Sequence, residues 1–98
     1  MEYSPKYVGG KYSIYQNEKI ESLNGSPDYV GLDYTMTDCN LKSLKFISKH
    51  IGGDLYLFGN KLKSTKYIPS EFSGHIDLSY NKLPHIIKSN NDSSNILT

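Results

Sequence analysis

The chain has 98 residues, enough for one domain but too few for two, because each half would bury too little surface to offset the entropy of ordering it. Its composition of 37% hydrophobic and 21% charged residues, with a net charge of +1, excludes the highly charged disordered class and the large basic excess typical of nucleic-acid binders. One cysteine excludes an internal disulfide, no run approaches the roughly 18 apolar residues of a membrane span, and residues 1–10 do not resemble a signal peptide, so we expect a cytoplasmic protein without a membrane segment.

A period of 21 residues organises the chain. A first segment from Ser4 supplies apolar positions with a one-residue shift, and three further segments begin at Ser22, Ser43 and Ser64. Five largely apolar columns recur at this spacing: Leu23, Leu44, Thr65 and Ile86; Val30, Ile51 and Phe72; Tyr34, Leu55 and Ile76; Met36, Leu57 and Leu78; Leu41, Leu62 and Leu83. Because a fixed period of this length is the signature of stacked coils, the sequence predicts a solenoid of about four turns.

The predicted elements of a coil follow each other in a fixed order. In the third coil a glycine turn at 52–53 leads into a strand over 54–58, then an asparagine turn at Asn60 and a back segment around 67–69. We expect the glycines to permit the turn before each strand. We expect the asparagine side chains to point inward and to hydrogen-bond the backbone, which applies to Asn17, Asn60 and Asn81. Cys39 stands in the same column and is expected to make such bonds only weakly.

The repeat resembles the leucine-rich-repeat family, whose core reads L-x-L-x-x-N/C-x-L. The matching segments are 34–41, 55–62 and 76–83, with Cys39 in the asparagine position of the first. One departure recurs, because glycine or serine replaces the usual leucine three residues before the strand. The resemblance implies a β-rich α/β solenoid with a short parallel sheet on its concave face. We assign residues 1–87 to this solenoid and residues 88–98 to a polar, flexible tail.

Nothing in the sequence supports catalysis or cofactor binding. His50, His75 and His85 fall in different columns, and His50 shares a back-segment column with tyrosines, which favours a half-buried packing role. Cys39 is expected to be a buried filler of the asparagine position rather than a nucleophile. The glycine pairs lack the Lys-Ser/Thr of a phosphate loop, and no ligand set has the spacing of a metal site. The sequence therefore predicts a protein that is not an enzyme and holds no cofactor or metal.

The outward face of the predicted strands is the candidate binding surface. Alternate strand residues project away from the core, and here they are aromatic and acidic. The candidate partner-binding residues are Tyr15, Asp33, Thr35, Asp54, Tyr56, Phe58, His75, Asp77 and Tyr80. Rigid aromatic anchors in a negative field are typical of protein interfaces, so we predict docking of a protein partner with a basic or mixed surface. The plainer alternative is a solvated sheet face without a partner.

Two other functions stay open. Lysines recur after the asparagine turns and form a flank consisting of Lys42, Lys45, Lys61, Lys63, Lys66 and Lys82. Such flanks usually remain solvated and prevent edge-to-edge aggregation. Because arginine is absent and no aromatic residue is clearly interleaved, nucleic-acid binding is the less favoured alternative. Self-association through thinly capped solenoid ends, giving a homo-oligomer or a structural assembly, is the other.

The short period with prolines in the back segment is similar to leucine-rich repeats of bacterial and phage proteins. This likeness implies a small phage-encoded protein that binds and inhibits a bacterial host factor, such as a defence protein, in the host cytoplasm. The inference is an analogy at the level of the fold, because leucine-rich repeats share a scaffold and differ in what they bind.

Overall fold

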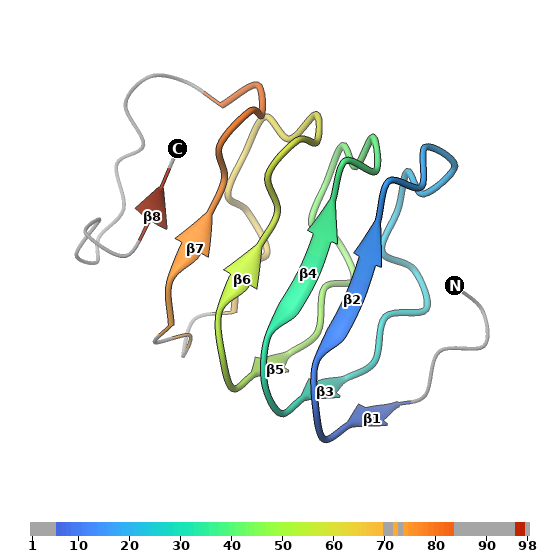
Figure 1. The fold of residues 1–98 in the computed structure, drawn as a ribbon, viewed down its shortest axis with the longest axis vertical. Helices are drawn as coiled ribbons and strands as arrows, with labels where there is room; N and C mark the ends of the chain where they lie inside the picture. Colours follow the sequence, from blue (N-terminus) through green and yellow to red (C-terminus); the bar gives the residue numbers. More distant parts are fainter. Residues whose placement is uncertain (1–5, 70–71, 73, 84–95, 98) are drawn as a thin grey trace.

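A computed structural model describes residues 6–69, 72, 74–83 and 96–97, which form a β-solenoid of about three turns (Figure 1). The larger of two parallel sheets has the order β2-β4-β6-β7-β8. Its strands are β2 Tyr12–Tyr15, β4 Tyr34–Thr37, β6 Leu55–Tyr56, β7 Ile76–Asp77 and β8 Ile96–Leu97. The smaller sheet has the order β1-β3-β5. Its strands are β1 Tyr7–Val8, β3 Tyr29–Val30 and β5 His50–Ile51.

The register confirms the period and its first irregular step. Tyr12 pairs with Tyr34, Tyr34 with Leu55, and Leu55 with Ile76, so three successive turns take 22, 21 and 21 residues. The solenoid therefore has about three turns where the sequence predicted about four. Residues 1–5 and 84–95, on which the ends of the predicted solenoid fall, lie outside the described residues.

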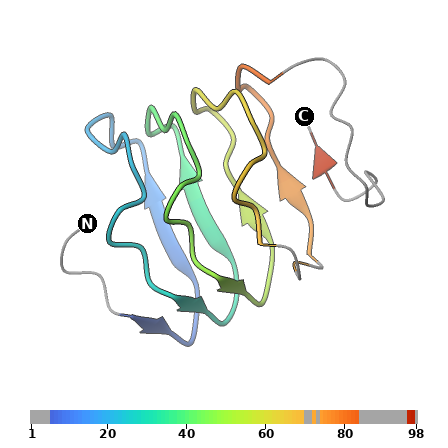
Figure 2. The ribbon, with the colours of Figure 1, turned by 180° about the vertical axis from the view of Figure 1, so that it is seen from behind.

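Each coil passes from the smaller sheet into the larger one and returns behind it. Figure 2, seen from the side opposite to Figure 1, shows the return segments that follow β2, β4 and β6 in front of the paler strands of the large sheet, with β1, β3 and β5 along one border of the molecule. The part of the chain that the structure describes contains no helix, so the helical share of the predicted α/β class is not found there. The large sheet is thus one face of the molecule, and the return segments form the opposite face.

The repeated columns form the core. Along β4 the side chains of Tyr34 and Met36 point inward, and the matching residues of the next two coils stack beside them. Fully or nearly fully buried are Leu23, Val30, Tyr34, Met36, Leu41, Leu44, Leu55, Leu57, Leu62, Ile76 and Leu78. No single coil could bury these residues alone, so each coil depends on its neighbours for its apolar burial.

The return segments stop after one turn instead of continuing as helices. Ile47 donates its backbone N–H to the carbonyl of Leu44 at 3.0 Å, which closes a single turn. The residue before Ile47, Phe46, has a φ of 72°, in the left-handed region that a right-handed helix cannot accommodate. The same turn recurs in the neighbouring coils, where the positive φ falls on Gly25 and Tyr67. A left-handed residue in each of these three coils therefore ends the local helical path.

The glycines before the strands are required by close contact between neighbouring coils. A Cβ atom on Gly31 would collide with the carbonyl of Gly9, and one on Gly52 with the carbonyl of Gly31. At the same level Gly31 donates its N–H to Val8 at 2.7 Å, and Gly52 donates to Val30 at 2.9 Å. Neither glycine has a positive φ. The requirement is therefore the absence of a side chain between two backbones, not a left-handed turn.

Asn60 joins two coils through its side chain, as predicted. Its Oδ1 accepts the backbone N–H groups of Cys39 and Leu41 at 3.1 and 3.0 Å, both from the preceding coil. Its Nδ2 donates to the carbonyls of Met36 and Leu57 at 2.7 and 2.9 Å. With these four backbone partners, both polar atoms of the buried Asn60 amide are hydrogen-bonded. Asn81 repeats the arrangement one coil later, and its Oδ1 accepts the N–H of Leu62 at 3.0 Å.

The prediction for Asn17 is right for its hydrogen bond to the backbone of the turn and wrong for its inward orientation. Its side chain is exposed and accepts only the N–H of Lys19, two residues ahead in the same turn, at 3.2 Å. The physical reason is its position in the first coil, since a side chain that bonds the preceding coil needs such a coil beside it. The same motif position therefore has different partners at the end of the array and in its interior.

Cys39 replaces only half of the asparagine function. Its thiol is buried and lies 3.1 Å from the Thr37 carbonyl and 3.8 Å from the Ile14 carbonyl. These carbonyls correspond to two that Asn60 bonds in the next coil, Phe58 and Met36. A thiol is a single weak donor, so the acceptor role of the asparagine oxygen has no counterpart here. The expected weak bonding is confirmed.

Ile96 and Leu97, which the sequence analysis placed in a polar tail, form β8 beside β7. The register pairs Ile76 with Ile96 and Asp77 with Leu97. The predicted boundary at residues 87–88 lies outside the described residues. Leu97 lies 21 residues after Ile76, so the period extends into the segment assigned to the tail, although the register step from Ile76 to Ile96 is 20 residues.

Replacing Asn60 with alanine should lower the free energy of unfolding by about 3 kcal/mol or more, because it leaves buried amides and carbonyls of two coils unpaired. Asn17→Ala is the matched control, and its exposed side chain predicts a change below about 0.5 kcal/mol. Urea unfolding followed by circular dichroism measures both. Equal effects of the two substitutions would contradict the role assigned to Asn60.

Gly52→Ala should destabilise the protein by about 1–3 kcal/mol, since the added methyl group must push two coils apart. Gly10→Ala is the control, because a Cβ there has no atom within 4 Å and only restricts the unfolded chain. The comparison uses the shift in thermal midpoint of the two variants. If Gly52→Ala lowers the thermal midpoint no more than Gly10→Ala does, the close contact between the backbones of the two coils is not required.

Candidate partner-binding surface

The outward side of the large sheet carries exposed aromatic rings. Tyr15 at the end of β2 is 63% exposed, and Phe58, just beyond β6, is 36% exposed. Thr37 of β4 is the register partner of Tyr15 and is buried. The following residue, Asp38, donates its N–H to the Phe58 carbonyl at 3.2 Å, which places Phe58 beside β4 on its other side. The two exposed rings therefore come from segments on either side of a buried threonine.

Thr35 does not contribute accessible surface to this face. It is 7% exposed although its strand position points outward, and its register partners are Ser13 on β2 and Tyr56 on β6. A short side chain on a central strand is covered when larger side chains stand on the neighbouring strand. Thr35 therefore belongs to the packing of the face, and contacts with a partner fall to the residues around it.

Two of the three candidate aspartates connect successive coils. Asp33 accepts the backbone N–H of Asp54 on its Oδ1 at 2.8 Å, and Asp54 accepts the N–H of His75 in the same way at 2.9 Å. Each carboxylate thus bonds the first outward residue of the following coil. Hydrogen bonds to ionised acceptors are among the stronger ones, so this carboxylate ladder fixes the spacing of the strands on this face. The sequence predicted these residues only as partner-binding residues, and nothing in it indicated this structural role.

Asp77 bonds within its own coil. Its Oδ1 accepts both the N–H and the hydroxyl of Ser79, with the N–H at 3.0 Å. This turn follows β7 and leads to Tyr80, which has a φ of 57° and is 85% exposed. In the preceding coil the corresponding residue is Gly59, with a φ of 76°. A backbone conformation that suits glycine therefore presents the Tyr80 side chain to solvent.

The negative field predicted for this face acts on Tyr56. Its phenol donates to Asp54 Oδ2 at 3.2 Å. This hydrogen bond and the charge of Asp54 raise the pKa of Tyr56 above its ordinary value, and the charges of Asp33 and Asp77 add in the same direction. The three carboxylates therefore act together at one position on the sheet. His75 is exposed at the start of β7 and completes the row.

A second aromatic feature lies on the smaller sheet. Tyr7 stacks on Tyr29 with ring centroids 4.5 Å apart, and Tyr29 stacks on His50 at 4.4 Å. His50 is exposed, not half-buried as predicted, yet its ring has the packing role that its column indicated. The column spacing was the signal, because β1, β3 and β5 place these three residues in register.

Within the described residues no group of three or more histidine, cysteine, aspartate or glutamate side chains could hold a metal ion. No helix in that part of the chain is long and apolar enough to cross a membrane. Comparison of the chain with protein-family models, curated proteins and solved structures gives no match. The arrangement of the side chains therefore carries the functional argument by itself.

Asp54→Asn should lower the pKa of Tyr56 toward its ordinary value, because the phenolate would no longer form beside that charge. Asparagine keeps an oxygen for the His75 N–H, so the coil contact is retained. NMR titration of tyrosine Cζ signals, assigned with a Tyr56→Phe variant, measures the change. Tyr15 in the same spectra is the internal control. An unchanged Tyr56 titration would contradict the assigned contact.

Proposed function

We propose that the protein is a non-enzymatic binding module that docks a protein partner on the outward face of its large sheet. The observation that carries the proposal is the combination of exposed rings at Tyr15 and Phe58 with the three carboxylates that act on Tyr56. Aromatic side chains bury much area with little loss of rotamer entropy, so they suit the centre of an interface. The surrounding negative charge favours a partner with a basic or mixed surface.

The rigidity of the face supports this proposal. Its strands are hydrogen-bonded coil to coil, and Asp33 and Asp54 fix two of the steps through their carboxylates. A preorganised surface loses little conformational freedom when a partner binds, which raises affinity for a given contact area. The small size of the face favours a compact epitope or a short segment of the partner.

We further propose that the coils are of the leucine-rich-repeat type. The positions that the motif requires to be apolar or asparagine are buried in the third coil, at Leu55, Leu57, Asn60 and Leu62. By analogy with short repeats of this kind, the partner class is a bacterial host or defence protein that a phage product inhibits. Catalysis forms no part of the proposed function.

The proposal is tested by affinity capture from a bacterial lysate, followed by calorimetry with the purified partner. Replacing both Tyr15 and Phe58 with alanine should weaken binding at least about thirtyfold, equivalent to ~2 kcal/mol, if the two rings are interface anchors. Tyr7→Ala is the matched control, because Tyr7 is as exposed as Tyr15 but lies on the smaller sheet.

Equal binding by the double variant and the wild type would exclude this face as the docking site. If no partner is retained, sedimentation velocity over a range of protein concentrations decides whether the chain instead associates with itself. A sedimentation coefficient that rises with concentration would replace the proposal by self-assembly.

A further inference from the structure

Two successive coils carry the same basic and aromatic segment on the return side. The segments read KSLKF at 42–46 and KSTKY at 63–67, whereas the coil before them reads ESLNG at 21–25. Each of the later coils thus has two lysines and an aromatic residue where the earlier coil has glutamate, asparagine and glycine. These substitutions between coils do not serve the core, because Lys45 and Phe46 are both exposed.

The backbone of the three segments is the same. In each, the serine hydroxyl oxygen accepts the N–H two residues ahead, at 3.1, 3.1 and 3.0 Å for Ser22, Ser43 and Ser64. The last residue of each segment has a positive φ, of 93° at Gly25, 72° at Phe46 and 80° at Tyr67. The turn therefore forms with glycine, and its geometry does not explain the aromatic residues.

Phe46 and Tyr67 occupy a conformation that is unfavourable for bulky side chains. They gain little burial in return, since their rings are 53% and 46% exposed. They also make no ring contact with each other, unlike the stacked rings of the smaller sheet. Strained residues that do not serve packing tend to occur where a ligand is bound. The two rings are therefore better explained by binding than by stability.

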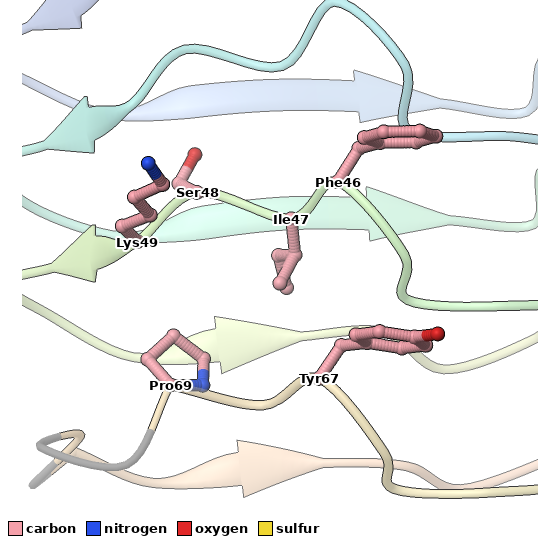
Figure 3. A pocket seen from close by; sticks show the side chains of 6 residues that line it. All are labelled: Phe46, Ile47, Ser48, Lys49, Tyr67 and Pro69. Atoms are coloured by element: carbon pink, nitrogen blue, oxygen red, sulfur yellow. The ribbon is translucent and has the colours of Figure 1, made fainter.

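The rings stand over a groove on the return side. Figure 3 shows Phe46 and Tyr67 on neighbouring coils at one end of it and Ile47 pointing into the space between the coils. The groove has a volume of about 380 Å³ and is also lined by Ser48, Lys49 and Pro69. The Nζ atoms of Lys45 and Lys66 each lie 5.2 Å from the centroid of the adjacent ring. From the sequence no aromatic residue was clearly interleaved among the lysines, whereas in the structure one aromatic ring lies beside a lysine in each of these two coils.

A second hollow collects the other lysines of these coils. It has a volume of about 320 Å³ and is lined by Lys42, Lys61, Lys63 and Lys82. Among the described residues no carboxylate lines it, and none of the four lysines forms an ion pair with another of these residues. Asp33, Asp54 and Asp77 lie on the strand face, and no described carboxylate is paired with these lysines. A polyanion would find charges there that no described side chain neutralises.

We propose that the aromatic groove and the lysine hollow together bind single-stranded nucleic acid. Bases would stack on Phe46 and Tyr67, and phosphates would contact the lysines. The unit that repeats from coil to coil is one ring with its lysines, which matches a polymer carrying one base and one phosphate per residue. An acidic peptide would satisfy the lysines but has no planar group at each step. In a duplex the base faces are already stacked and cannot receive the rings.

The test is fluorescence anisotropy of labelled oligothymidylate and oligouridylate with the full chain over a range of salt concentrations. If the four lysines of the hollow each neutralise one phosphate, the plot of log affinity against log salt concentration should have a slope of about −3. The oligonucleotide with the higher affinity shows whether the protein prefers single-stranded DNA or RNA. A duplex should compete more weakly than either.

The decisive variant replaces both Phe46 and Tyr67 with glycine. Glycine relieves the strained backbone, so this variant should unfold at the same or a higher urea concentration than the wild type. Its affinity for the oligonucleotide should fall about tenfold for each ring removed. The double variant Lys42→Gln/Lys63→Gln should reduce the magnitude of the salt slope by about 1.4. Alanine at Tyr15 and Phe58 is the control on the strand face and should leave the affinity unchanged.

Three results would overturn the proposal. Absence of binding at low salt excludes the site. If the stably folded glycine variant binds the oligonucleotide with unchanged affinity, Phe46 and Tyr67 are not part of the binding site. Competition by polyglutamate as effective as that by the oligonucleotide would instead identify the ligand as an acidic protein segment.

Discussion

The fold depends on one constraint, the direct contact of the backbone of each coil with the next. At Gly31 and Gly52 two backbones meet so closely that no side chain fits between them, and hydrogen bonds hold them at that distance. This spacing lets buried side chains stack in continuous rows and lets Asn60 reach the amides of the preceding coil. The same spacing determines both surfaces described above, because it sets the distance between equivalent side chains of neighbouring coils.

The period of the sequence was sufficient to predict the solenoid, its buried columns and the 22-residue first step. It was not sufficient for features that depend on which neighbour is present. Asn17 has the same motif position as Asn60 but differs in bonding because it belongs to the first coil. The missing helices follow from left-handed residues such as Phe46, and the residue type gives no indication of that conformation. The period does reach β8 at Leu97, but the polar residues 88–95 before it favoured a tail, and the register is one residue shorter than the period.

The outward residues of the strands could be predicted in the same way, since alternation along a strand decides the direction of a side chain. Which of these residues are accessible to a partner could not be predicted. Thr35 is covered because of its position on a central strand, and Asp33 is engaged because the N–H of Asp54 lies within its reach. The period already aligns Gly25, Phe46 and Tyr67, but the left-handed conformation that these three residues share could not be predicted from it.

The two kinds of polar link between coils point in opposite directions along the chain. Asp33 and Asp54 bond the coil that follows, whereas Asn60 and Asn81 bond the coil that precedes. A coil taken from this protein and inserted into another array would therefore carry half of each junction and depend on its new neighbours for the rest. Transferable units for protein engineering are pairs of adjacent coils, with the cuts made in the return segments, where the aspartate and asparagine links are absent from the described residues and the hydrogen bond from Ser48 Oγ to the Pro27 carbonyl must be kept within one unit.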